Sequence, residues 1–177
     1  MKKLFFSIIL IIIANTLTAQ IQKGSVLLGG TLGIHNYNNE GTGITFFDVF
    51  PKVGFFLSNR FALGGGLEFR LVTSDGSSAG SIGQSIFSRI YFNKSGMSRF
   101  FAQLDLGAWE PDLDDGEVDI LTTGSLSLGA DFFLNQNVAI ETLLGYRRLQ
   151  DFESDAGLNN IFLNIGVAAF IGGNKGR

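Results

Sequence analysis

Large apolar residues alternate with small or charged residues along much of this chain. Between Phe61 and Leu71 the large apolar side chains occupy odd positions, whereas Glu68 and Arg70 occupy even positions among small residues. Neighbouring residues of a β-strand point to opposite faces, so this alternation predicts a strand with one apolar face. Wherever the Leu, Ile, Val and Phe positions fix the phase of a strand, we expect the charged residues inside it to lie on the opposite face.

The same alternation predicts eight strands, at residues 25–35, 44–57, 61–72, 85–92, 99–109, 120–134, 138–149 and 161–171. Their connections are of two kinds: long polar segments at 36–43, 73–84, 110–119 and 150–160, and short turns at 58–60, 93–98 and 135–137. Long and short connections alternate along the chain. This arrangement predicts an all-β, antiparallel, up-and-down barrel with its long connections at one end and its short turns at the other.

An internal similarity supports this register. Residues 55–63 resemble residues 132–140, and Arg70 then corresponds to Arg147 at the same offset. Two equivalent turns of one barrel and an internal duplication both account for the similarity. In either case, the two segments mark turns at the same end of the barrel.

The number of large side chains on each face predicts which face lines the lumen. The apolar face carries more large side chains than the interior of an eight-stranded barrel can hold, so we expect it to point outward. Membrane strands exclude charge from their lipid face, where Lys or Arg at mid-bilayer costs about 2–4 kcal/mol. The pattern therefore favours a transmembrane barrel over a soluble, lipocalin-like one. Representative residues expected to contact lipid are Phe61, Leu63, Phe69, Leu104, Leu128 and Leu163.

The N-terminus has the three parts of a secretory signal peptide. Lys2 and Lys3 precede an apolar run over residues 4–14, and a polar stretch then ends at Ala19. The apolar run is too short for a membrane helix, which needs about 20 residues. We expect residues 1–19 to be a signal peptide cleaved after Ala19, and residues 20–177 to form one barrel domain.

Composition and charge narrow the range of partners. Without Lys2 and Lys3, 11 of the 13 basic residues remain against 16 acidic ones, which is a net charge of −5. Such an acidic chain argues against a nucleic-acid partner. The chain has no Cys, so neither a disulfide nor a lipid on an N-terminal Cys is available to it.

Charged residues of both signs share the predicted inner face. They form a candidate charge network in the lumen: Asp48, Lys52, Glu68, Arg70, Arg89, Asp105, Asp131, Glu141 and Arg147. An isolated ion in a narrow lumen would cost several kcal/mol, so we expect these residues to pair across it. Six phenylalanines are expected on the same face: Phe46, Phe56, Phe87, Phe101, Phe133 and Phe162. Together these side chains predict a plugged lumen, although an ion or proton path through the pairs is an alternative.

Two segments resemble the strand and turn motifs of small outer-membrane β-barrel proteins. Residues 51–56 (Pro-Lys-Val-Gly-Phe-Phe) and residues 129–134 (Gly-Ala-Asp-Phe-Phe-Leu) are similar to those of the OmpA/OmpX-like type, and in particular to versions made by Bacteroidota. The resemblance implies a location in the outer membrane. Two features depart from it: Phe170 is followed by Ile171 and a polar tail, and the interfacial belt contains few rings other than Phe. We expect its amphipathic rings to be Trp109, Tyr91 and Tyr146.

The predicted long connections are strongly acidic. They contain Glu40, Asp75, Glu110, Asp112, Asp114, Asp115, Glu117, Asp119, Asp151, Glu153 and Asp155. If they face outward, they lie beside lipopolysaccharide phosphates, where divalent cations would bridge the two. Membrane lipid and lipopolysaccharide are thus the expected partners, and a monomer the expected state.

No motif specifies catalysis. His35 is the only histidine, and Ser74, Asp75, Ser77 and Ser78 are the residues that a serine-dependent reaction could draw on. Ser and Asp are common in turns for conformational reasons alone, so we predict no catalytic residue and no cofactor. The function expected is a structural or surface-binding role in the envelope. A small-solute or ion pore and a lipid A modifying enzyme are the alternatives.

Overall fold

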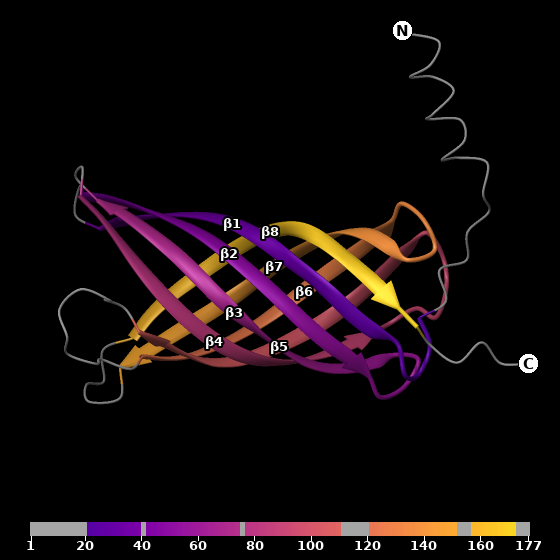
Figure 1. Cartoon of the computed structure of the whole chain (residues 1–177). Coiled ribbons are helices and arrows are strands. Elements are labelled where there is room, and N and C mark those ends of the chain that lie inside the picture. The colour runs from indigo at the N-terminus through magenta and orange to yellow at the C-terminus, as the bar shows by residue number, and fades with distance from the viewer. Residues whose placement is uncertain (1–20, 40–41, 75–76, 111–120, 152–156, 173–177) are drawn as a thin grey trace, which may run out of the picture.

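The computed structural model of this chain is a closed barrel of eight antiparallel strands (Figure 1). The structure describes residues 21–39, 42–74, 77–110, 121–151 and 157–172, and it describes the backbone alone at 35–39, 42–45, 72–74, 77–79, 110, 151, 157 and 158. Among these residues, no helix has the length and apolar character needed to cross a membrane. The predicted fold class, an eight-stranded antiparallel up-and-down β-barrel, is confirmed.

The strands follow the chain around the barrel. They are β1 (Val26–Asn39), β2 (Thr42–Phe56), β3 (Phe61–Ser74), β4 (Ser77–Tyr91), β5 (Ser98–Glu110), β6 (Leu121–Phe133), β7 (Val138–Asp151) and β8 (Gly157–Ile171). Each strand pairs with its neighbour in sequence, and β1 closes the barrel by pairing with β8, as in the Leu32 and Ile165 pair. No sheet edge is left open, so the backbone groups of the paired strands bond within the wall.

The two ends of the barrel differ in their connections (Figure 1). We call one end the turn side, because β1 begins there, β8 ends there, and the connections after β2, β4 and β6 lie there. We call the opposite end the loop side, because β1, β3, β5 and β7 end there and β2, β4, β6 and β8 begin there. The alternation predicted from the sequence therefore sorts the connections correctly between the two ends.

The outward face is apolar, as the alternation predicts. Leu63, Phe69, Leu104, Leu128 and Leu163 are 43% to 63% exposed, and Phe61 is half-buried. These side chains lie on the outside of a closed wall, so the apolar face of the strands points outward and not into the lumen.

One charged residue contradicts the predicted sorting of charge. Arg148 follows the inward Arg147 in β7, and its side chain is exposed. It lies near the loop-side end of the strand, where Gly124 and Asn159 are its paired neighbours. A long Arg side chain at the edge of an apolar band reaches the polar boundary with its head, so charge is tolerated there.

Three of the predicted long connections are largely wrong. The paired strands β1 and β2 continue to Asn39 and Thr42, β3 and β4 continue to Ser74 and Ser77, and β7 and β8 pair as far as Gln150 and Gly157. Residues 36–39, 42–43, 73–74, 77–84, 110, 150–151 and 157–160, predicted as loops, therefore lie in strands. These strand ends are rich in Asn, Ser, Thr and Gly, and backbone pairing continues there without the apolar alternation from which we predicted strands.

The two repeated segments form matching turns on the turn side. The amide of Leu57 donates to Phe61 O at 2.9 Å, and the amide of Leu134 donates to Val138 O at 2.8 Å. Ser58 Oγ accepts from the amide of Phe61 at 3.1 Å in the first turn, and Asn135 Oδ1 accepts from the amide of Val138 at 2.8 Å in the second. The similarity between the two segments thus encodes the same turn twice.

Aromatic rings on the inner face pack against glycines of neighbouring strands. A Cβ at Gly64 would collide with the ring of Phe87, and a Cβ at Gly129 would collide with the ring of Phe101. A Cβ at Gly145 would likewise collide with the ring of Phe162. Glycine leaves room for a ring to lie against the wall, which lets a narrow barrel hold large side chains.

Several predictions fall outside the described residues. The signal peptide over residues 1–19 is one of them. The acidic residues of the loop-side connections are also among them, apart from the backbones of Glu110 and Asp151 at the ends of β5 and β7.

Candidate functional site

The inner face of the barrel carries most of the ionisable side chains that the structure describes. The nine residues proposed for the charge network all lie there, eight of them buried and Asp105 half-buried. Arg99, which the sequence interpretation left out, is fully buried on the same face. With Arg99, the described part of the inner face contains five acidic and five basic side chains, so its charges balance.

Four of these residues form a group nearer the turn side, which we call the turn-side ion group: Lys52, Arg89, Asp131 and Glu141. Arg89 Nη1 donates to Glu141 Oε2 at 2.6 Å and lies 3.9 Å from Asp131 Oδ2. Lys52 Nζ binds the other oxygen of Glu141, Oε1. Because Lys52 is in β2 and Glu141 is in β7, this pair connects strands that are not neighbours. The contact therefore crosses the lumen.

A second set, the loop-side ion group, contains Asp48, Glu68, Arg70 and Arg147. Arg70 holds Asp48 with two hydrogen bonds, Nε to Oδ1 at 2.6 Å and Nη2 to Oδ2 at 3.1 Å. Arg147 reaches across from β7 and donates to Glu68 Oε1 at 2.6 Å. Arg70 Nη2 lies 3.4 Å from the same oxygen. The two arginines that correspond in the internal repeat thus converge on one carboxylate.

Neutral polar side chains extend the turn-side ion group. Gln103 Oε1 accepts from Arg89 Nε at 2.8 Å, and Gln103 Nε2 donates to Asp105 Oδ1 at 2.8 Å. Tyr91 Oη donates to Asp131 Oδ2 at 2.6 Å. These bonds satisfy oxygens and nitrogens that ion pairing alone would leave without partners in a dry interior.

Aromatic faces cover the guanidinium groups. The Arg89 guanidinium carbon lies 3.8 Å from the ring centre of Phe101, and that of Arg70 lies 4.1 Å from the ring centre of Trp109. Cation–π attraction is stronger where water is excluded, so these contacts stabilise the buried charges in addition to their ion pairs.

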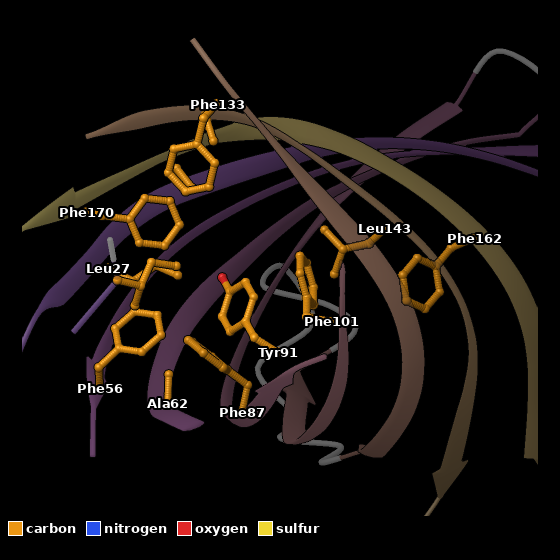
Figure 2. Packing of buried hydrophobic residues seen from close by; sticks show 13 residues of the cluster. Leu27, Phe56, Ala62, Phe87, Tyr91, Phe101, Phe133, Leu143, Phe162 and Phe170 are labelled. Carbon is orange, nitrogen blue, oxygen red and sulfur yellow. The ribbon is translucent and has the colours of Figure 1, made fainter. Parts of the chain in front are cut away.

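Buried apolar side chains close the lumen towards the turn side (Figure 2). The rings of Phe133 and Phe170 lie 5.1 Å apart, Phe56 lies 6.1 Å from Phe170, and Tyr91 lies 5.7 Å from Phe56. Leu27 is fully buried in the same cluster. These side chains come from the turn-side ends of β1, β2, β4, β6 and β8, so the cluster spans the lumen there.

A cavity separates the two ion groups. Its volume is about 20 Å³, which is room for one or two water molecules or a small ion. Lys52 of one group and Glu68 and Arg147 of the other line it, together with Asp105. The lumen that the structure describes is therefore filled by side chains with a small polar space near its middle.

Two predicted interfacial rings are inside the barrel instead. Tyr91 is 1% exposed and Trp109 is 3% exposed, whereas Tyr146 is 48% exposed on the outside. Tyr91 is two residues from Arg89, and Trp109 is four residues from Asp105, so the even spacing already put both on the charged face. The same signal identifies Gln103 and Arg99, which the sequence interpretation missed.

The residues considered for catalysis are not brought together by the described backbone. His35 in β1 pairs with Phe46 in β2, whereas Ser74 in β3 pairs with Ser77 in β4. Ser74 therefore lies two strands away from His35. Asp75 is outside the described residues.

Comparison with solved structures identifies similar barrels. The N-terminal β-barrel domain of OprF from Pseudomonas aeruginosa superposes with a TM-score of 0.55 at 13% identity, over 84% of this chain and 98% of that domain. The outer membrane protein OprG from the same organism superposes with a TM-score of 0.53 at 9% identity, over 86% of this chain and 98% of that one. No protein family and no curated protein matches the sequence. At these identities the likeness shows the fold alone, a closed β-barrel.

Proposed function

We propose that this chain is an outer-membrane β-barrel protein with a closed lumen, and that it serves the envelope as a structural or surface-binding protein. The observation that carries this proposal is the sorting of side chains by face. Large apolar residues cover the outside along all eight strands, while ten charged residues lie on the described inner face. In water the exposed apolar surface would favour aggregation, whereas in a bilayer it is solvated by lipid.

The closed lumen is supported by contacts that cross it. The Lys52–Glu141 and Arg147–Glu68 pairs each join strands on different sides of the wall, and the aromatic cluster fills the turn-side end. Opening a path would require breaking buried ion pairs and leaving unpaired charges, which costs several kcal/mol for each pair.

The remaining parts of the proposal follow from the sequence. Residues 1–19 direct export and are removed, and residues 20–177 form the barrel of an OmpA/OmpX-like protein of the Bacteroidota type. The loop side faces the cell exterior, where its acidic residues meet lipopolysaccharide and the divalent cations that bridge to it. The barrel acts as a monomer, without a cofactor or a catalytic residue.

Conductance of the refolded protein in planar bilayers tests the closed lumen. We expect no stable conductance, because the ion groups and the aromatic cluster block the lumen. Arg70→Ala and Phe56→Ala each remove part of the obstruction, and brief openings in these variants would show that insertion succeeded. Steady openings of the wild type on the nanosiemens scale would reject the closed lumen and favour a small-solute or ion pore.

A separate experiment tests the absence of enzymatic activity. Lipid A mass spectra of cells with and without the gene should be identical, and His35→Ala should complement any envelope phenotype as well as the wild type does. Deletion of residues 112–119 removes five acidic residues and should weaken complementation. An acyl change in lipid A that wild type restores and His35→Ala does not would favour the enzyme.

A further inference from the structure

Arg148 is an exception on the outer face of the barrel. Among the described residues of the strands, it is the one Lys or Arg whose side chain points outward. Within the same part of the chain it forms no ion pair. Its charge is therefore available to a group outside the chain.

The outer face changes from apolar to polar at the level of Arg148. On the last three strands, paired large side chains form one exposed row: Leu126, Tyr146 and Ile161. The next outward row towards the loop side, which we call the polar row, is paired in the same way and consists of Gly124, Arg148 and Asn159. Because the register aligns the three strands, the apolar surface ends at one height on all of them.

The height of the polar row on the wall matches the edge of a membrane. Val138, at the turn-side end of β7, precedes Arg148 by ten residues. At about 3.3 Å per residue this is roughly 33 Å along the strand, and a tilt of about 40° reduces it to roughly 25 Å of height. The apolar band of outer-membrane barrels is about 25 Å tall. Tyr146, exposed one row below Arg148, has the kind of amphipathic ring that lies at such edges.

The polar row leaves room beside the guanidinium. Gly124 pairs with Arg148 from β6, and a Cβ there would meet Leu106 Cδ2 alone, at 3.7 Å. Asn159 pairs with Arg148 from β8, and its side chain is exposed. The charge therefore has an open space on one side and a neutral hydrogen-bonding group on the other.

From this arrangement we propose that the polar row binds a phosphate group of a glycolipid in the outer leaflet, with Arg148 as its charged ligand and Asn159 as a neutral donor. A guanidinium fork binds two phosphate oxygens at once, and such charge-assisted hydrogen bonds are the strong ones. The apolar rows below offer a surface to the acyl chains of the same molecule, which favours a lipid over free phosphate. The inference rests on the membrane location and the outward loop side of the proposed function.

The acidic loop-side connections give this contact a distinct property. Their carboxylates repel a phosphate unless a divalent cation lies between the two. Arg148 supplies its own positive charge and needs no such cation. Binding at the polar row should therefore survive chelation of divalent cations, whereas bridging to the acidic residues should not.

Native mass spectrometry of the refolded full chain in detergent micelles with EDTA tests the proposal. The probes are diphosphoryl lipid A, the same lipid without its phosphates, and inorganic phosphate. We expect one molecule of diphosphoryl lipid A to bind about tenfold more tightly than the dephosphorylated lipid, since a hydrogen bond to a charged group contributes about that factor. Inorganic phosphate should not be retained.

Matched variants locate the binding. Arg148→Ala should lower the affinity for diphosphoryl lipid A to that for the dephosphorylated lipid. Arg148→Lys should recover part of the loss, because an ammonium keeps the charge and lacks the planar fork. Gly124→Asp places a carboxylate opposite Arg148 in the open space and should compete with the phosphate. Arg60→Ala is the control, since Arg60 is an exposed arginine on the turn side and its removal changes the net charge equally.

Three results would overturn the proposal. Equal binding of the two lipids by the wild type would mean that water alone solvates Arg148. Equal losses in Arg148→Ala and Arg60→Ala would show attraction by net charge without a site. Binding of inorganic phosphate as tight as that of diphosphoryl lipid A would identify a site for soluble anions instead of a lipid.

Flotation with phosphatidylcholine vesicles separates this inference from the proposed function. Membrane insertion depends on the apolar outer face, so the wild type and Arg148→Ala should float equally with these vesicles, which have no net charge. A barrel that floats and shows no preference for the phosphorylated lipid would reject the lipid site and leave the membrane location intact. A barrel that does not float would reject both.

Discussion

Arg147 and Arg148 are neighbours in β7 with opposite environments. Arg147 is buried and donates to Glu68 Oε1 at 2.6 Å, whereas Arg148 is exposed on the outer face. Arginine is therefore a partner in a cross-lumen ion pair at position 147 and a surface group at position 148. Alternation of the strand alone produces this difference.

Replacing each of these two arginines shows how much a charge paired in the lumen adds to the free energy of unfolding, compared with a charge on the outer face. Arg147→Ala leaves Glu68 with the longer contact to Arg70, and removal of one partner of a buried pair typically costs about 3–5 kcal/mol. We expect the free energy of unfolding, measured with urea in lipid vesicles, to fall by this amount. Arg148→Ala should leave it unchanged, and similar losses in both variants would show that Arg147 is not a buried partner.

Which side chains of the lumen bind each other could be predicted only in part. Alternation predicts that Asp48, Glu68 and Arg70 share the inner face, and they do so. It does not predict that Lys52 binds Glu141, because that contact depends on how strands far apart in sequence are staggered around the closed barrel. Arg99 and Gln103 were missed, although their even spacing from Asp105 in the same strand places them on the inner face.

At the scale of the strands, the wall accommodates its interior rings by means of glycine. Gly64 in β3 lies beneath the ring of Phe87 in β4, where a Cβ would also collide with the carbonyl oxygen of Val53. Gly80 in β4 has no atom within 4 Å of the position that its Cβ would take. Glycine is therefore required for packing at the first position and not at the second.

This contrast predicts unequal effects of the same substitution. Gly64→Ala should force Phe87 or the paired strand to move, and overpacking of this kind typically costs about 1–3 kcal/mol. Gly80→Ala should change the free energy of unfolding by less than about 0.5 kcal/mol, as surface substitutions usually do. Urea unfolding of both variants in the same vesicles measures the difference. Equal stability of the two would mean that Phe87 does not pack on Gly64.

Strand phase was predictable from the sequence and strand length was not. The period of two fixes which side of the wall each residue occupies, because shifting the phase by one residue would move every apolar side chain into the lumen. The ends of β1 to β4 on the loop side have no such constraint. Their polar residues pair through the backbone and do not follow the apolar alternation, so the sequence contains no boundary signal at Asn39, Thr42, Ser74 or Ser77.

For the molecule as a whole, closure of the barrel separates a charged and aromatic lumen from an apolar outer surface. The wall presents apolar side chains outward, while its lumen holds two neutral ion groups, a polar cavity and an aromatic cluster. Neither side could be exchanged with the other, since the interior has no room for the outer set and lipid does not solvate the inner one. The orientation of the wall is thus the property on which the membrane proposal depends.

The single tryptophan of the chain measures that orientation directly. Trp109 is 3% exposed and lies against the Arg70 guanidinium inside the barrel, so brominated lipid chains should quench its fluorescence only weakly. Leu106, in the same strand, is 53% exposed on the outer face. Moving the indole there, with Leu106→Trp in a Trp109→Phe background, should give strong quenching by the same lipids.

Comparison of the two proteins in one set of vesicles controls for insertion, because the outward indole reports that the barrel has entered the bilayer. Bromine quenches through short-range contact, and a fluorophore in the lumen is separated from lipid by the wall. Strong quenching of Trp109 in the wild type, equal to that of the relocated indole, would mean that the charged face contacts lipid and that the phase of β5 is displaced by one residue. Such a displacement would expose Asp105 to the hydrocarbon, at a cost that the apolar outer face of the folded barrel avoids.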